Sequence, residues 1–104
     1  MLNIREILDS IGIPVAEESF YTAPPLPYLI FMEQQDVRGS DSKNKIVEQA
    51  ITIELYTNKI TPEIEQKIEV LLNQIPVEFT RDRMWLSAEK MYETLYTFSL
   101  VGKV

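Results

Sequence analysis

Hydrophobic residues recur along the chain with two different periods, and these periods predict its helices and strands. Near the N-terminus the spacing is three or four residues, which predicts a helix over residues 2–11 whose apolar face holds Ile4, Ile7, Leu8 and Ile11. Gly12 suits the C-terminal boundary of this helix, and Pro14 prevents the helix from resuming. Residues 15–22 read as a short extended piece. The following "APPLPY" must also be extended, because each proline biases the preceding residue away from the α conformation.

Two stretches in the middle of the chain alternate with the two-residue period of β-strands. The first, "YLIFMEQ" at residues 28–34, is apolar on both faces, with Tyr28, Ile30 and Met32 on one side and Leu29 and Phe31 on the other. The second, "IVEQAITIELYT", alternates cleanly and places on one face Ile51, Ile53 and Leu55. The two strands most simply form an antiparallel hairpin. Its polar loop, residues 36–47, is longer than the usual hairpin connection of about 2–5 residues.

The second half of the chain predicts one more helix and two more strands. Residues 61–75 form the helix, with Thr61 as its cap and Pro62 at its first helical position. Its apolar stripe holds Ile64, Ile68, Leu71, Leu72 and Ile75. A third strand begins near Val77. The fourth covers residues 92–101 and places on one face Tyr92, Tyr96, Phe98 and Leu100.

These elements predict an α+β fold with the order α-β-β-α-β-β. Two helices with one apolar face each favour a two-layer sandwich, in which both pack on one face of a four-stranded, mainly antiparallel sheet. The length of 104 residues suggests a single domain, residues 1–104. The strands carry more apolar surface than two helices can cover, so the second face of the sheet is a candidate subunit interface.

The residue types that the chain lacks limit its chemistry. With no cysteine and no histidine, disulfides, thiolate chemistry, zinc–sulfur sites and Ser–His or Cys–His nucleophile systems are excluded. Four Asp and twelve Glu leave a carboxylate enzyme open, but nothing groups them into a metal loop or an acid/base pair. We therefore expect no enzyme activity, no cofactor and no metal. No apolar run approaches the roughly 20 residues of a membrane span, and the acidic N-terminal segment is unlike a signal peptide.

Charge is unevenly distributed along the chain. The net charge of −6 argues against wrapping of nucleic acid, which needs a basic face. The loop of residues 36–47 is slightly basic, because it holds two aspartates and three basic residues, namely Arg38, Lys43 and Lys45. This loop is either an ordinary solvated loop or an arm that docks on the acidic surface of another copy. The acids expected to receive such an arm are Glu48, Glu54, Glu63, Glu65 and Glu69.

Aromatic and arginine side chains supply further interface candidates. Trp85 stands close to Arg81 and Arg83, and tryptophan and arginine are enriched at interface hot spots, although a buried core tryptophan is the alternative. Tyr56 carries the same ambiguity. The candidate interface residues are therefore Arg38, Lys43, Lys45, Glu54, Tyr56, Arg81, Arg83 and Trp85. The "PPLP" segment has the PxxP spacing of SH3 ligands, but a stiff connection into the next strand is the simpler interpretation.

The order of these motifs resembles a known family. An N-terminal helix is followed by a proline-preceded "PYLIF" strand, a polar loop and an "IELYT" strand, then by a helix that starts with Thr–Pro and a closing "YTFSL" strand. This order resembles the small tail-terminator, or tail-completion, proteins of long-tailed bacteriophages and their prophage relatives. The resemblance spans nearly the whole chain. It is carried by regions, namely residues 28–34, 36–47 and 51–56, and it names no binding site.

The resemblance implies a non-enzymatic virion part that reaches the tail or neck from the host cytoplasm. Such α+β subunits close into a ring, typically a hexamer, which caps the tail tube and presents a docking surface to the DNA-filled head. Its partners would be further copies of itself, the tail-tube protein and a head-completion or connector protein. DNA would pass through the ring without sequence-specific contact, and no membrane is involved. A head-closure or other minor neck protein, a bacterial α+β interaction domain and a carboxylate enzyme are the alternatives.

Overall fold

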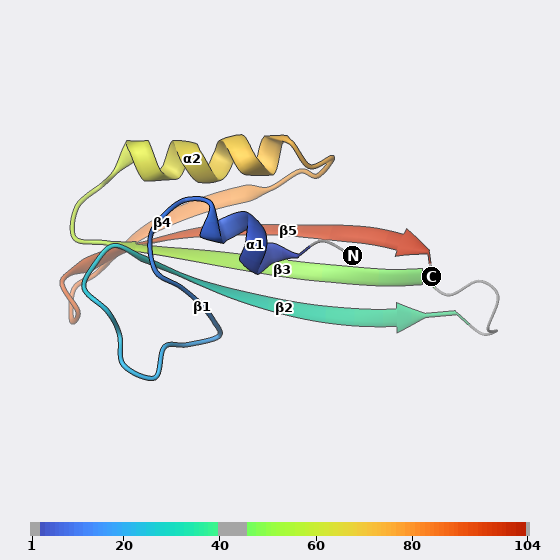
Figure 1. Ribbon diagram of the computed structural model, residues 1–104, viewed down its shortest axis with the longest axis horizontal. Coiled ribbons are helices and arrows are strands. Elements are labelled where there is room, and N and C mark those ends of the chain that lie inside the picture. The colour runs from blue at the N-terminus through green and yellow to red at the C-terminus, as the bar shows by residue number, and fades with distance from the viewer. Residues whose placement is uncertain (1–2, 40–45, 104) are drawn as a thin grey trace.

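The computed structural model describes residues 3–39 and 46–103 of the chain. Two helices and five strands follow one another in this part of the chain (Figure 1). In order they are α1 (Ile4–Asp9), β1 (Val15–Glu17), β2 (Tyr28–Arg38), β3 (Ile46–Thr57), α2 (Pro62–Asn73), β4 (Thr80–Leu86) and β5 (Met91–Lys103). The α+β class is therefore confirmed.

The sheet is mixed and has five strands in the order β1-β2-β3-β5-β4, so the prediction of four strands is wrong. The additional strand is β1, which lies parallel to the first part of β2, whereas all other neighbours are antiparallel. Backbone hydrogen bonds fix it, because Leu29 N donates to the Pro14 carbonyl at 2.8 Å and Glu18 N to the Phe31 carbonyl at 2.8 Å. A strand of three residues is too short to show the alternation of apolar and polar residues, so the sequence predicts only an extended segment here.

One face of the sheet carries the core, and both helices cover it as predicted. Along β3 every second residue is buried, namely Val47, Gln49, Ile51, Ile53, Leu55 and Thr57. The neighbouring strands add on the same face Leu29, Phe31, Tyr96 and Phe98. The helices close the cluster with Ile4, Leu8, Ile11, Ile68 and Leu72. Each such fully buried side chain contributes about 1.5–3 kcal/mol of transfer free energy.

The helix ends follow local capping chemistry, with one correction. Asn3 caps α1, since its side chain accepts a hydrogen bond from Glu6 N at 3.2 Å. Gly12 has a φ of 92°, a left-handed conformation that glycine adopts without strain just beyond a helix. Thr61 occupies the N-cap position of α2 as predicted, but its hydroxyl does not cap. It donates instead to the Lys59 carbonyl at 2.9 Å.

The hairpin of β2 and β3 is longer than predicted, and its connection is shorter. Residues expected in the loop are paired in the sheet, with Asp36 opposite Glu48 and Arg38 opposite Ile46. Polar residues can extend these strands because this part of the hairpin is solvated on its open face. Together with β5, the two strands form the long end of a molecule that measures 49 × 28 × 22 Å (Figure 1). Lys43 and Lys45 lie outside the described residues.

Candidate assembly surface

The face of the sheet that bears no helix, here called the open face, combines apolar and acidic side chains. The alternate residues of β2 to β5 that point away from α1 and α2 form it. Its large exposed hydrophobic side chains are Met32, Ile46, Met84 and Val101. Three aromatic rings also follow one another across it. The ring centres of Phe20 and Tyr28 are 5.3 Å apart, and those of Tyr28 and Tyr56 are 5.2 Å apart.

The hydroxyl of Tyr56 lies between two carboxylates on the open face. It is 2.9 Å from Glu54 Oε1 and 2.7 Å from Glu93 Oε2. Burial, then the hydrogen bonds to these carboxylates and their charges, raises the pKa of the Tyr56 phenol. A phenol has one proton and can donate to one acceptor at a time. Among the described residues no lysine or arginine forms an ion pair with Glu54 or Glu93, so this spot is suited to receive a cation from a partner.

Two arginines of β4 point to the other face of the sheet, where α2 binds them. Arg83 binds the Glu65 carboxylate, and Arg81 Nη1 donates to Glu69 Oε2 at 2.7 Å. Glu65 is only 4% exposed, so its charge requires these partners. The Tyr96 hydroxyl donates to Glu69 Oε2 at 3.0 Å, and burial followed by that hydrogen bond raises the pKa of Tyr96. This cluster fastens the edge strand β4 to α2.

Trp85 is 50% exposed, so the alternative of a buried core tryptophan is wrong. Its ring packs against Tyr92, with the ring centres 4.8 Å apart. Met84, beside it on the open face, is 46% exposed. The end of β4 thus presents large side chains on both faces of the sheet, which is the kind of surface that interfaces bury.

The structure does not bring the candidate interface residues together in one place. Glu54 and Tyr56 lie on the open face, whereas Arg81, Arg83 and Trp85 lie on the helix-covered face. Arg38 lies at the far end of β2, and its ion pair with Glu48 is long, at 3.7 Å, and exposed. Three of the acids expected to receive a basic arm already form ion pairs within the chain, since Glu48 binds Arg38, and Glu65 and Glu69 bind the arginines of β4.

The sequence reading missed Glu93, and it named Glu65 and Glu69 only as acids that would receive a basic arm from another copy. Glu93 was readable in principle, because the alternation of β5 places it on the face opposite Tyr92, and pairing β5 with β3 sets it beside Tyr56. Glu65 and Glu69 are bound instead by Arg81 and Arg83 of the same chain. Only the position of α2 over β4 shows that Glu65 is a buried ion-pair partner, and that placement has no local signal.

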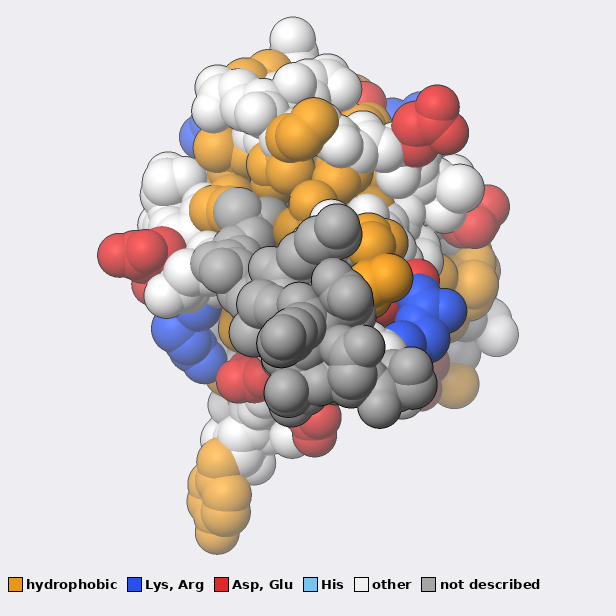
Figure 2. All heavy atoms as spheres, turned by 90° about the vertical axis from the view of Figure 1, so that its right-hand side faces the viewer, with side chains coloured by type: hydrophobic (Ala, Val, Ile, Leu, Met, Phe, Trp, Pro, Cys, Tyr) orange, Lys and Arg blue, Asp and Glu red, His pale blue; other side chains and the backbone are white. Residues whose placement is uncertain are grey.

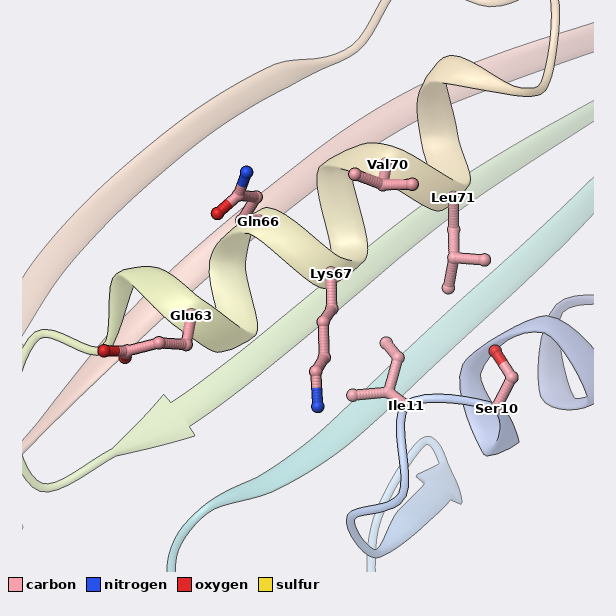
Figure 3. A pocket seen from close by; sticks show the side chains of 7 residues that line it. All are labelled: Ser10, Ile11, Glu63, Gln66, Lys67, Val70 and Leu71. Atoms are coloured by element: carbon pink, nitrogen blue, oxygen red, sulfur yellow. The ribbon is translucent and has the colours of Figure 1, made fainter.

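A groove of about 530 Å³ lies between the end of α1 and α2. Figure 3 shows Lys67 and Leu71 of α2 directed toward Ile11, while Gln66 projects from the opposite side of the helix. Most of the lining surface is apolar, although four of its seven residues are polar.

In residues 3–39 and 46–103, no group of three or more acidic, histidine or cysteine side chains is placed to hold a metal ion. None of the helices in the described part of the chain is long and apolar enough to cross a membrane.

Comparison with known proteins identifies a shared fold. No protein-family model matches the chain, and no curated protein matches it. A solved structure described as the virion of a native gene transfer agent (GTA) particle contains a chain with a similar fold, at a TM-score of 0.64. The sequence identity is 10%, and the match covers 94% of this chain and 84% of the other. At this identity the match shows a shared fold.

Proposed function

We propose that this protein is a non-enzymatic structural part of a tailed virion, namely a tail terminator. It caps the tail tube as a ring and joins the tail to the head connector. The observation that supports this proposal is the match in fold to a virion chain over nearly the full length of both chains. On separate grounds, the order of sequence motifs resembles the small tail-terminator proteins of long-tailed bacteriophages. Location in the tail or neck and contact with the tail-tube protein belong to this proposal.

The surface chemistry fits a subunit that is completed by its neighbours. The open face exposes four large hydrophobic side chains, and the Glu54–Tyr56–Glu93 cluster carries negative charge without an intramolecular ion pair among the described residues. Arg38, with Lys43 and Lys45 beyond it in the sequence, supplies positive charge at the far end of the hairpin. We infer that the basic end of one copy approaches the acidic open face of the next. The apolar area supplies most of the affinity, and the charges mainly set the rate and register of encounter.

Deletion of the gene, followed by electron microscopy of the particles, tests the proposal. A tail terminator stops polymerisation of the tube, so its loss should give tails of uncontrolled length beside DNA-filled heads without tails. The full-length protein supplied from a plasmid should restore normal tails. The Leu55→Ala variant leaves a cavity in the core and destabilises the fold. It serves as a negative control that shows whether restoration of normal tails requires a folded protein.

Two other outcomes would assign a different function. Tails of normal length that fail to join heads would identify a head-closure or neck protein. Normal, infectious particles would remove the virion function and favour a bacterial interaction domain. A tail-tube gene directly downstream of this gene would independently support the tail terminator.

A further inference from the structure

Both edges of the sheet present unpaired backbone over a stretch of similar length. At one edge lies β4, Thr80–Leu86, which pairs with β5 on its inner side. At the other edge, β1 covers Leu29–Phe31 of β2 and leaves the rest of that strand, Met32–Arg38, without an outer neighbour among the described strands. An unpaired strand edge offers a row of N–H and C=O groups to another chain.

Both edges carry charged side chains, but neither contains a residue that breaks strand pairing. The β4 sequence "TRDRMWL" and the β2 segment "MEQQDVR" contain no proline, glycine or lysine. Arg81 and Arg83 form ion pairs with glutamates of α2. Because their charges are balanced there, these arginines do little to repel another strand from the β4 edge. By contrast, the other half of the β2 edge is covered by β1, whose start is set by Pro14. The chain thus covers one half of an edge and leaves the other half bare.

The directions and faces of the two edges are compatible with each other. β2, β3, β5 and β4 alternate in direction, so β4 runs antiparallel to β2. If β2 of a second copy is placed beside β4 with its helices on the same side, the alternation continues without a break. Odd-numbered residues of both strands face the helices, and even-numbered residues of both lie on the open face. Side chains of the two copies would therefore keep their environments across the junction.

Charge favours this head-to-tail contact and one register of it. Self-pairing of two β4 strands about their midpoint would set Arg83 opposite Arg83, and like charges directly opposite each other are destabilising. Full overlap of β4 with the bare β2 edge would set Asp82 opposite Asp36. A shift of two residues toward the far end of β2 sets Asp82 opposite Arg38 instead, and it moves Leu86 away from β1 to a position opposite Gln34.

We propose that copies of this protein associate head to tail by pairing Asp82–Leu86 of β4 in one copy antiparallel to Gln34–Arg38 of β2 in the next, which makes one continuous sheet. The contact is heterologous, so it propagates until rotation between copies closes a ring. This inference deepens the ring assembly of the proposed function, but it stands on the two strand edges and does not depend on a tail. Figure 2 views the molecule from the far end of the hairpin, where hydrophobic side chains lie among acidic and basic groups.

Disulfide trapping tests the pairing, because the chain has no cysteine of its own. A Met84→Cys variant is mixed at about millimolar concentration with each of three partner variants, Met32→Cys, Gln34→Cys and Asp36→Cys. All four positions are exposed on the open face, so the substitutions spare the core. After mild oxidation, mixed dimers should form at least several-fold faster than with a Gln66→Cys control on the exposed side of α2. The fastest partner should be Asp36→Cys.

A double variant, Met84→Cys with Asp36→Cys, distinguishes the head-to-tail contact from a simple dimer. Within one chain β4 and β2 are three strand spacings apart, roughly 14 Å, which is too far for a disulfide. The double variant should therefore give a ladder of covalent oligomers on a denaturing gel. A preference for Met32→Cys or Gln34→Cys would overturn the register and support the edge contact.

The proposal is overturned if Met84→Cys couples no faster with the β2 variants than with the Gln66→Cys control, or if it couples mainly with itself. Failure of this test and failure of the proposed function are separable. If the β4–β2 cross-link forms but the protein does not control tail length, the strand contact is supported and the tail-terminator function is rejected. If the protein terminates tails normally but the cross-link does not form, the tail-terminator function is supported and the strand contact is rejected.

Discussion

The two faces of the sheet each carry a tyrosine hydroxyl hydrogen-bonded to a glutamate, and the difference between them separates folding from assembly. On the helix-covered face, Tyr96 is fully buried and bonds to Glu69, whose charge is balanced by Arg81. On the open face, Tyr56 is partly exposed and lies between Glu54 and Glu93. No intramolecular ion pair in the described part of the chain balances these two acids.

A cluster whose charges cancel within the chain stabilises the chain itself. A cluster with surplus charge lowers the stability of the chain, because its like charges repel each other. A partner of opposite charge can bind to such a cluster. We therefore propose that the Tyr96 cluster serves the stability of the subunit and that the Tyr56 cluster serves contact between subunits.

Matched leucines on the two faces should differ most. Leu55 is fully buried on the helix-covered face, and Leu95, opposite Glu54, is partly buried on the open face. Leu55→Ala should cost about 2–5 kcal/mol of unfolding free energy, because it leaves a cavity in a closed core. Leu95→Ala should cost about 1 kcal/mol or less. Denaturant unfolding at low protein concentration measures both.

Equal losses for the two leucines would contradict the division into a folding face and an assembly face. A loss for Leu95→Ala that grows with protein concentration would show that the open face is already buried between copies of the free protein, because subunit binding then adds to apparent stability.

Removing a buried acid should have the next largest effect. Glu65→Ala leaves Arg83 without its carboxylate and loosens β4 from α2. Breaking a fully buried ion pair costs about 3–5 kcal/mol, but water still reaches the Arg83 side chain, which is 31% exposed, so we expect about 1–2 kcal/mol. Glu93→Ala on the open face is the matched control and should cost much less. Thermal melts of both variants under the same conditions compare them.

Hydrogen exchange of the β4 amides distinguishes loosening of this strand from global destabilisation. If Glu65→Ala lowers the melting temperature without raising exchange in β4 above that in β3, the cluster does not fasten the edge strand.

The sequence predicted those parts of the molecule whose signals are local. The apolar stripe of α2 and the alternation of β3 are fixed by side chains three, four or two positions apart, and both elements formed as expected. The strand β1 was not predicted, because its place in the sheet depends on backbone contacts with Leu29 and Phe31 far along the chain. The predicted loop was too long, because Asp36 has weak strand propensity but pairs here with Glu48 of the partner strand.

The candidate site was predicted less well for the same reason. Trp85, Arg81 and Tyr56 were chosen by residue type, and type does not specify the face of the sheet or the partner. The two arginines proved to be bound within the subunit, while the missing partner of Tyr56, Glu93, comes from a strand 37 residues away. Placing such groups requires the strand order and register of the whole sheet.

Alkaline unfolding should follow from the raised pKa values of the two tyrosines. An unfolded tyrosine loses its proton near pH 10, whereas burial keeps the Tyr96 proton bound in the folded state. Above about pH 10 the folded state thus holds more protons than the unfolded state, and the free energy of unfolding falls as pH rises. The fully buried Tyr96 contributes a slope of about 1.4 kcal/mol per pH unit. Tyr56, which is partly exposed and screened by water, contributes less.

Phenylalanine variants assign this slope to the two faces. Between pH 9 and 11, Tyr96→Phe should remove most of the pH dependence that the two residues share, and Tyr56→Phe should remove a smaller part. Denaturant unfolding at several pH values gives the slopes. A steeper dependence in Tyr96→Phe than in Tyr56→Phe would reverse the assignment of the two clusters.

The smallest change in subunit stability should come from Glu93→Gln. Tyr56 has one proton for two carboxylates, so the native cluster contains an unfavourable pair of like charges. The substituted amide can donate a hydrogen bond to the Tyr56 hydroxyl and removes one of the charges. We therefore expect the free energy of unfolding to change by no more than about 0.5 kcal/mol, toward higher stability at low salt. This gain should decrease as salt screens the charges.

Self-association at low salt should weaken in the same Glu93→Gln variant, because the basic hairpin end of the next copy loses one of its two carboxylate acceptors. Unfolding and sedimentation experiments on one preparation measure the two effects. A loss of more than about 1 kcal/mol with unchanged self-association would show that the Tyr56 cluster serves the fold, as the Tyr96 cluster does.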